Sequence, residues 1–282
     1  MRLGGIQALS GAGAGSGVRE RHCAWLAGLA LIAWTGLVAT PALGADLPEI
    51  RKAGTLRVLV VDGSPAFFNL GSDGEPGLDK EILEAFARLH KLTLRAVEVP
   101  TWGALVPWLL EGRGDLLGGG VTVTPARAQL VDFSHELLPT RNVIVTRKPK
   151  GVVETMQQLR GVRVGAMRGS SMAEALVAAE IPFDDGIASG GGVAALRKGT
   201  VEAILSGIED ALLYRQSDPA IQVGMFLGPS GSLAFGVRKD APELKRELDS
   251  YVANLRRTPT WNRLIVKYFG EAAPELLKRA RE

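Results

Sequence analysis

The sequence predicts an α/β protein of two lobes, each an open sheet flanked by helices. Apolar, β-branched runs alternate with segments of helical periodicity, which is the pattern of an open sheet covered by helices. This alternation occurs twice along the chain, so it predicts two such units. Two extended segments, Arg141–Lys148 and Ser232–Arg238, join the units. Two connections between two units predict a double hinge.

Residues 1–44 have the organisation of a secretory signal peptide. Arg19 and Arg21 precede an apolar run at 24–44, and Ala42-Leu43-Gly44 offers a small-x-small cleavage site. A retained membrane anchor is the alternative, since the run approaches the roughly 20 residues that a spanning helix needs. The small-residue exit favours cleavage, so we expect an exported chain.

Composition excludes several classes of function for residues 45–282. They carry 30 basic and 29 acidic groups, which argues against a nucleic-acid or anionic-membrane surface. The single cysteine, Cys23, lies in the predicted signal peptide, so no disulfide or thiolate site is expected. His90 and His135 are far apart in sequence, so neither a histidine-based metal centre nor a cofactor is expected.

The first unit begins with TLRVLVV, whose β-branched apolar residues predict a buried parallel strand. Ile82, Leu83, Phe86 and Leu89 then form one helical face, and a second helix carries a predicted kink at Pro107. In chain order, we expect a strand at 55–61, a helix at 77–90, a strand at 92–97, a helix at 102–112 capped by Thr101, and a strand at 115–118.

The second unit repeats the alternation and ends at a Gly-Pro-Ser-Gly segment, 228–231, that predicts a turn. Two helices close the chain, one capped by Asp240 and one that follows Pro259 and stops at Gly270. The second unit is expected to contain strands at 161–167, 202–206 and 221–226 and helices at 170–179, 192–198 and 208–216.

One stretch, DLLGGGVTVTPARAQLVDFS, has the composition of an anion clamp. Its glycines allow close backbone approach, and Thr122 and Thr124 precede Arg127, whose planar fork of donors matches a carboxylate. The alternative is that Pro125 and Ala126 open a surface helix on which Arg127 is a solvated charge.

The order and spacing of several short motifs resemble the periplasmic solute-binding proteins of ABC transporters, in the polar amino-acid-binding type (bacterial extracellular solute-binding protein family 3). No single motif is specific, but together they cover nearly all of residues 45–282. They include Gly54–Val58, Pro65–Phe67, Gly74-x-x-Gly77-Leu-Asp79, the stretch from Asp115 to Arg127, Val131–Ser134, Leu159–Gly165, Gly169-Ser170, Gly236–Lys239 and Tyr268-Phe269-Gly270.

The resemblance implies a type II periplasmic-binding-protein fold, with a ligand cleft between two lobes joined by two hinge strands. Lobe 1 would comprise 45–143 plus 232–282, and lobe 2 would comprise 144–231 with the hinge segments. It also implies a periplasmic, monomeric protein without catalytic activity that binds a small carboxylate solute by lobe closure and delivers it to an ABC permease.

The resemblance assigns site residues on lobe 1. Arg127 matches the arginine that grips the ligand carboxylate, and Gly120 and Thr122 match positions that offer backbone and hydroxyl groups. Trp102 matches an aromatic wall, and Phe67 lies close to a second one. Asp62 matches a position that reads the ligand side chain, although a turn-forming Asp before a glycine is the alternative.

On lobe 2, Ser170 and Ser171 open a helix and could share the carboxylate with Arg127, or simply cap the helix. Met167 and Arg168 match positions that contact the ligand side chain.

The chain departs from the family pattern at Gly207, where an aspartate commonly holds the ligand ammonium. Glycine cannot balance a buried cation. Either Glu209 or Asp210 substitutes, or the ligand is an organic acid rather than an α-amino acid.

Two other functions stay open. The same fold resembles cyclohexadienyl dehydratases, which act on prephenate-like acids and would need a proton donor such as Asp62, Glu209 or His135. A ligand-sensing module for a separate partner is the third possibility.

Overall fold

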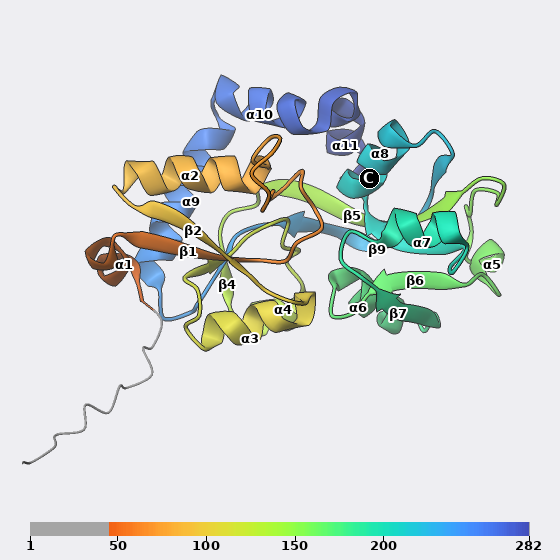
Figure 1. The fold of residues 1–282 in the computed structure, drawn as a ribbon, viewed down its shortest axis with the longest axis horizontal. Coiled ribbons are helices and arrows are strands. Elements are labelled where there is room, and N and C mark those ends of the chain that lie inside the picture. Colours follow the sequence, from red (N-terminus) through yellow and green to blue (C-terminus); the bar gives the residue numbers. More distant parts are fainter. Residues whose placement is uncertain (1–44, 282) are drawn as a thin grey trace, which may run out of the picture. The chain divides into compact units, whose positions relative to one another are not determined.

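Two five-stranded mixed sheets organise residues 45–281, the part of the chain that this computed structural model describes (Figure 1). The predicted signal peptide, with Cys23, lies outside these residues. The strand orders are β2-β1-β3-β10-β4 and β7-β6-β8-β5-β9. The two sheets and their flanking helices confirm the predicted α/β class, and we name the halves built on them lobe 1 and lobe 2.

In the first sheet, β1 pairs in parallel with β2 and β3. Leu56 and Val58 of β1 face one apolar core and Leu59 faces another, so the strand is buried on both sides, as its apolar run predicts. Antiparallel β10 joins β3 to β4. The strands are β1 (Thr55–Val60), β2 (Thr93–Glu98), β3 (Leu116–Leu117), β4 (Asp132–Phe133) and β10 (Gly236–Val237).

Helices cover both faces of the first sheet, with α2 and α10 on one side and α3 on the other (Figure 1). Ile82, Leu83 and Phe86 of α2 are buried as predicted, whereas Leu89 at its end is exposed. The helices are α1 (Leu47–Ala53), α2 (Leu78–Leu89), η1 (Trp102–Ala104), α3 (Leu105–Leu110), α4 (Pro125–Leu130), α9 (Pro242–Arg256), α10 (Pro259–Phe269), η2 (Gly270–Ala272) and α11 (Ala273–Arg279).

The helix predicted over 102–112 is divided between Ala104 and Leu105, where η1 ends and α3 begins. Pro107 lies in the first turn of α3, where a missing N–H has no intrahelical partner to lose. Asp240 does not cap α9. The carboxylate of Asp46 instead accepts the backbone N–H groups of Glu243 and Leu244, at 3.0 and 2.8 Å. Thr101 occupies the cap position of η1 without a side-chain bond.

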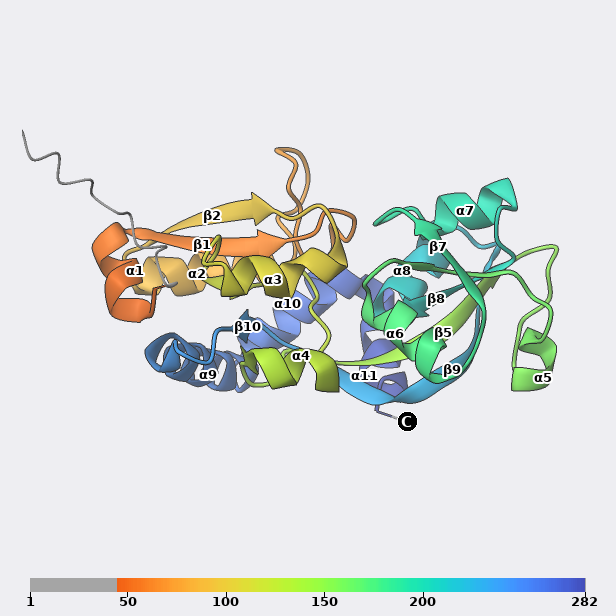
Figure 2. The same cartoon turned by 90° about the horizontal axis from the view of Figure 1, so that it is seen from below.

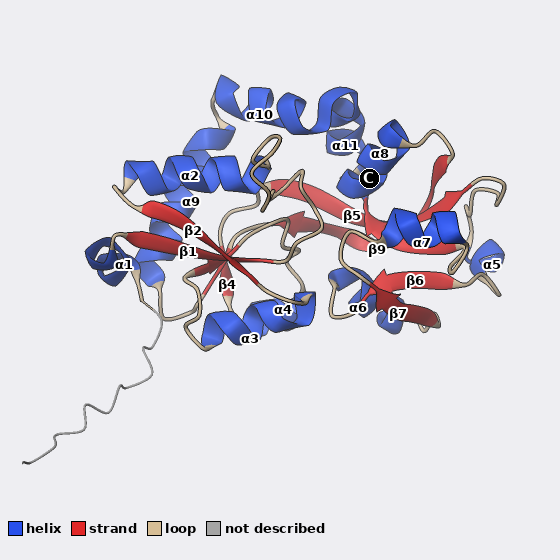
Figure 3. Ribbon diagram, in the orientation of Figure 1, coloured by secondary structure: helices blue, strands red, loops and turns tan. Residues whose placement is uncertain are grey.

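In the second sheet, β6 pairs in parallel with β7 and β8, and antiparallel β5 joins β8 to β9 (Figure 3). Helix α6 packs on one face of the sheet, and α7 and α8 pack on the other. The elements are β5 (Leu138–Arg147), α5 (Met156–Leu159), β6 (Val164–Met167), α6 (Ser171–Ala178), β7 (Phe183–Ile187), α7 (Gly192–Lys198), β8 (Ala203–Gly207), α8 (Ile208–Ser217) and β9 (Ile221–Leu233).

The long strands β5 and β9 run side by side between the two halves (Figure 2). Their pairing extends from Leu138 opposite Leu233 to Arg147 opposite Ile221. The predicted turn at 228–231 is wrong, because the chain continues through it as strand. The register of the β5–β9 pairing shifts there, because β9 has more residues than β5 between two paired positions. Gly228 lies in this bulge with φ of 77°, a left-handed conformation that glycine adopts readily. Ser232 and Leu233 therefore end β9, and only Gly236–Val237 form β10.

The C-terminal helix α11 packs against α8, a helix of lobe 2. Arg215 of α8 pairs with Glu275 of α11 at 2.5 Å, and Leu276 is fully buried. Within residues 45–281, no helix has both the length and the apolar character needed to cross a membrane.

Candidate functional site

A small pocket lies between the lobes and is lined from both. Its cavity volume is only about 30 Å³. The lobes are therefore close together, and a solute of amino-acid size requires the walls to move apart. The lining residues are Gly63, Ser64, Phe67, Trp102, Gly119, Gly120, Thr122, Arg127, Met167, Ser170, Ser171, Met172, Ser189, Gly190, Glu209, Asp210 and Tyr214.

Arg127 occupies one end of the pocket, held by the start of α4. Thr124 caps that helix by accepting the Arg127 N–H, and Pro125 occupies its first position, where no N–H is needed. The Arg127 side chain is not a solvated surface charge, because the residue is 6 % exposed. Its guanidinium donates to the carbonyls of Thr122 (3.0 Å) and of Gly169 in lobe 2 (3.4 Å).

Carbonyl oxygens are the partners of this guanidinium, and no carboxylate within residues 45–281 forms an ion pair with it. Burial lowers the pKa of Arg127, and the charge of Glu174 partly opposes that change. A buried guanidinium without a counter-ion can bind a ligand carboxylate in its planar fork.

Hydroxyl groups from both lobes meet beside Arg127. The Ser171 Oγ donates to the Thr122 Oγ1 at 3.0 Å, which joins lobe 2 to lobe 1. Ser170 lines the pocket but also caps α6, because its Oγ accepts the Ala173 N–H and donates to the Met167 carbonyl. The serine-cap interpretation therefore holds for Ser170, whereas Ser171 faces the opposite lobe.

The glycine turn before Thr122 is held by Asp79, a buried residue of α2. Its Oδ2 accepts the N–H groups of Gly119 and Gly120 at 2.8 and 2.9 Å. Burial raises the pKa of Asp79 to about 6, and these two bonds oppose the rise. The expectation of open amides at these glycines is therefore wrong, because Asp79 uses both. Gly77-Leu-Asp79 was recognisable as a motif, but its partner could not be read from sequence.

Phe67, Trp102 and Met167 form the apolar wall of the pocket. Phe67 is buried and packs edge-on against Phe269. A Cβ on Gly120 would come within 3.1 Å of the Phe67 ring, so the glycine makes room for it. The Trp102 Nε1 is buried without a hydrogen-bond partner among the described residues.

Two residues that the resemblance assigned to the site do not line the pocket. Asp62 is exposed, at the end of β1. The Arg168 side chain is 75 % exposed and forms a two-bond pair with Asp185, at 2.7 and 2.9 Å. A surface carboxylate thus holds Arg168 away from the cleft.

Glu209 supplies the acid that is missing at Gly207. A Cβ built on Gly207 would lie 2.0 Å from the Glu209 Oε1, so the Glu209 carboxyl occupies the space of a side chain at 207. The Thr140 Oγ1 donates to the Glu209 Oε2 at 2.7 Å. Both acids that the sequence offered as substitutes, Glu209 and Asp210, line the pocket, and Glu209 is the one that fills the space beside Gly207.

Asp210 is a second acid in the same pocket. Its Oδ1 accepts from the Ser64 Oγ of lobe 1 at 3.0 Å. Burial raises the pKa of Asp210 to about 6, and burial together with the charge of Asp210 raises that of Glu209 to about 8. The pKa of the neighbouring Tyr214 is raised by the same two acids and by burial, so its hydroxyl is neutral.

The sequence interpretation missed several pocket residues that come from loops and from one helix face. Ser64 follows β1, Ser189 and Gly190 follow β7, and Tyr214 lies one turn after Asp210. The run SGGG at 189–192 was a signal of close backbone approach. The other positions carry no motif. His135 lies outside this pocket and is exposed beside Asp249.

Two glycines form a close backbone contact between the lobes. Gly169, with φ of 71°, lies against Gly103 of η1, and a Cβ on Gly169 would be 2.6 Å from the Gly103 backbone N. A Cβ on Gly103 would instead meet its nearest atom, the Gly169 Cα, at 3.6 Å, which is an ordinary contact. The same added methyl group is thus excluded on one side and tolerated on the other.

We expect Gly169→Ala to prevent full closure and to weaken solute binding at least about tenfold, or about 1.4 kcal/mol. Gly103→Ala is the matched control and should bind within about twofold of the original chain. Small-angle scattering with saturating solute measures closure directly. Equal compaction of the two variants would contradict the steric argument, whereas a lower melting temperature of Gly169→Ala alone reports only its left-handed strain.

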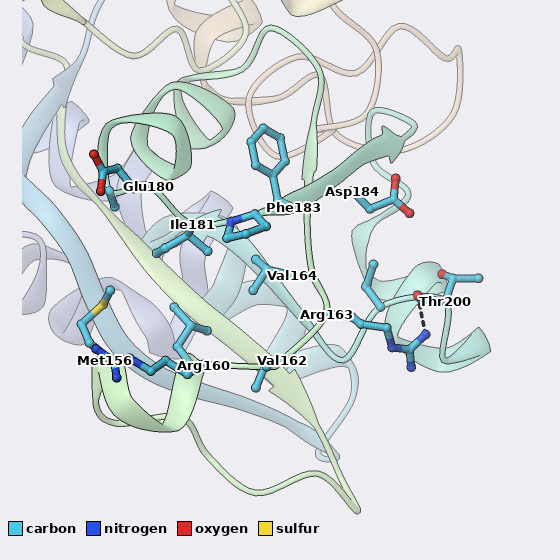
Figure 4. A pocket seen from close by; sticks show the side chains of 15 residues that line it. Met156, Arg160, Val162, Arg163, Val164, Glu180, Ile181, Phe183, Asp184 and Thr200 are labelled. Carbon is cyan, nitrogen blue, oxygen red and sulfur yellow. Dashed lines mark hydrogen bonds between the residues drawn. The ribbon is translucent and has the colours of Figure 1, made fainter.

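A larger groove opens on lobe 2 alone, around the start of β6 and β7 (Figure 4). Its volume is about 740 Å³. Apolar side chains such as Met156, Ile181 and Phe183 surround it, and Arg163 at its rim bonds the Thr200 carbonyl. It lacks a contribution from lobe 1, so lobe closure cannot shape it. Among the described residues, no group of three or more His, Cys, Asp or Glu could hold a metal ion.

Known proteins of this fold match the chain closely in structure and weakly in sequence. ArgBP from T. maritima, in a mutant form, superposes with a TM-score of 0.72 at 24 % identity, covering 80 % of this chain and 99 % of its own. An ancestral amino acid-binding protein described as a precursor of cyclohexadienyl dehydratase gives 0.71 at 25 % identity, covering 79 % and 99 %. These likenesses confirm the type II periplasmic-binding-protein fold.

Sequence relatives include binding proteins and larger proteins. The probable histidine-binding protein of Campylobacter jejuni is 24 % identical over 84 % of this chain and 96 % of its own length. The membrane-bound lytic murein transglycosylase F of Pseudomonas fluorescens is 24 % identical over 90 % of this chain but 53 % of its own length, so the chain spans about half of that relative. The model of the bacterial extracellular solute-binding proteins, family 3, matches residues 56–271, and the chain belongs to this family.

Proposed function

We propose that the protein is a periplasmic solute-binding protein that captures a small amino acid between its lobes and delivers it to an ABC importer. One observation carries this proposal. The buried Arg127 and Glu209 and the half-buried Asp210 line one pocket, and none of them forms an ion pair within residues 45–281. Buried charges are stable when they are paired, so the pocket is complementary to a solute that carries both signs of charge.

The position of the acids supports an α-amino acid over a simple organic acid. The carboxylate of the solute would bind Arg127, with Ser171 and Thr122 beside it, and the ammonium would bind Glu209. An organic acid would neutralise Arg127 but would leave both acids without a cation. Trp102 and Phe67 would contact the carbon skeleton.

Lobe closure is the proposed mechanism of capture. We propose that lobe 1 (45–143 plus 232–282) and lobe 2 (144–231) turn about β5 and β9. Three contacts would form on closure, since each joins the lobes: Arg127 to the Gly169 carbonyl, Ser171 to Thr122, and Ser64 to Asp210. A solute that touches both lobes would stabilise the closed state.

The test is a titration of the purified mature protein with amino acids and their des-amino analogues, measured by calorimetry and thermal shift. We expect amino acids to bind at least about 30-fold more tightly, because removing the ammonium leaves Glu209 unpaired at a cost of roughly 2 kcal/mol. Equal affinity for both series would show that the ammonium is not bound, and stabilisation by neither series would reject the binding function.

A dehydratase-like enzyme is the second candidate, because of Glu209. A carboxyl group whose pKa is raised to about 8 keeps its proton at neutral pH and can donate it to a leaving hydroxyl. His135 and Asp62, the other donors considered, lie outside the pocket. Turnover of prephenate by the pure protein, lost in Glu209→Gln, would establish this activity. We favour binding, since the similar proteins include a probable histidine-binding protein and an ancestral amino acid-binding protein.

A further inference from the structure

The pocket holds one acid more than a neutral amino acid needs. Glu209 and Asp210 are consecutive residues in the first turn of α8; Glu209 is buried and Asp210 is half-buried. Each accepts a hydrogen bond from a hydroxyl, Glu209 from Thr140 and Asp210 from Ser64. Glu209 already replaces the side chain absent at Gly207, so Asp210 is an additional carboxyl group.

Few charged groups face this pair. The neutral hydroxyl of Tyr214 lies one helical turn away, and Thr140 of β5 and Ser64 of lobe 1 carry no charge. On the side of α11, Arg215 and Glu275 neutralise each other. Arg127 is the cation in the pocket lining. Two adjacent carboxylates in a site of low dielectric repel each other, so full ionisation is unfavourable without a cation.

We infer that Glu209 and Asp210 together hold one proton in the solute-free protein, and that a solute with two cationic groups displaces this proton on binding. The inference rests on the proposed function. With one proton on the pair, the pocket has one positive and one negative charge, which matches a neutral amino acid. A second cationic group requires the second carboxylate. The carboxyl O–H then loses its proton to the buffer, and the carboxylate accepts a hydrogen bond from the solute N–H.

The sign of the pH dependence follows from the two raised pKa values. Below about pH 6 both acids tend to hold protons, and above about pH 8 neither does. A dicationic solute binds the ionised pair, so its affinity rises with pH across this window and levels off above it. One displaced proton corresponds to about tenfold in affinity per pH unit. A neutral amino acid displaces no proton near pH 7, so its affinity stays nearly constant there.

Calorimetry in buffers of different ionisation enthalpy counts the protons directly. Lysine and ornithine are the dicationic probes, and norleucine and glutamine are the neutral ones, each titrated at pH 7 in phosphate and in Tris. We expect about one proton released per dicationic solute and close to none per neutral solute. We also expect the dicationic solutes to bind at least about tenfold more tightly.

Asp210→Asn should abolish both the proton release and the preference for a second cation. Asp185→Asn, which removes an exposed acid outside the pocket, is the matched control and should retain both. Lysine binding without proton release, or equal release by norleucine, would overturn the inference and leave the proposed function intact. Binding of no amino acid at all would instead reject the proposed function.

Discussion

Replacement of Arg127 by alanine is expected to abolish the thermal stabilisation that the solute gives to the protein. The guanidinium is buried and lacks a counter-ion within the described residues, so the solute carboxylate would be left without its cation. Removal of one partner of a buried charged pair costs roughly 2–5 kcal/mol, or about 30-fold or more in affinity. The measurement is a thermal shift over a range of amino-acid concentrations.

Two further variants distinguish the loss of the Arg127 charge from a general loss of folding. Arg168→Ala removes an exposed arginine outside the pocket and should bind as the original chain does. Arg127→Lys keeps the charge but loses the planar fork, so it should bind with an intermediate affinity. If a folded Arg127→Ala variant were stabilised by the solute as much as the original chain is, Arg127 would not be the group that binds the solute carboxylate.

Removal of Glu209 is expected to have a comparable effect, which a second substitution should reverse. Glu209→Ala leaves the solute ammonium without a carboxylate and should weaken binding by roughly 2–5 kcal/mol. In Gly207→Asp combined with Glu209→Ala, a carboxyl group returns to nearly the same space, because the Glu209 oxygens lie 2.0 and 2.9 Å from a Cβ at 207. We expect this double variant to recover affinity to within about tenfold.

The single variant Gly207→Asp is the control for moving the carboxyl group from position 209 to position 207. Its backbone, with φ of −66°, accepts any residue, and Asp at the N-cap of α8 favours the helix. Its side chain would nevertheless compete with Glu209 for one space, so affinity should fall although the fold is retained. Calorimetry on the three variants tests the idea. A double variant as weak as Glu209→Ala would show that position 207 does not reach the solute.

Much of the fold could be predicted because buried strands and helix faces are apolar. β1 was recognisable from its apolar run, and α7 was predicted with the bounds that the structure gives. β7 was missed because an edge strand with two aspartates and a glycine lacks the apolar signal. The bulge at Gly228 was mistaken for a turn, since a glycine–proline pair serves both purposes and the pairing with β5 decides between them.

The candidate site was predictable where one local motif carried it. Arg127, Thr122 and Ser171 meet as expected, because the helix starts that place them are encoded nearby. The direction of the Arg168 side chain depends on a distant partner and was not predictable. Asp185 holds Arg168 outward, and Asp79 takes the amides of the glycine turn from a separate helix. Their roles in solute binding stay predictions until the variants are measured.

The contact of α11 with α8 bears on how the two halves can separate. β5 and β9 already connect the sheets, and α11 is a third attachment, through the Arg215–Glu275 pair and the buried Leu276. A body attached at two points can swing and also twist, but a third attachment away from that line restrains the twist. In the proposed opening, α11 would either move along with α8 or detach from it, so its contact would restrict the directions in which the lobes can separate.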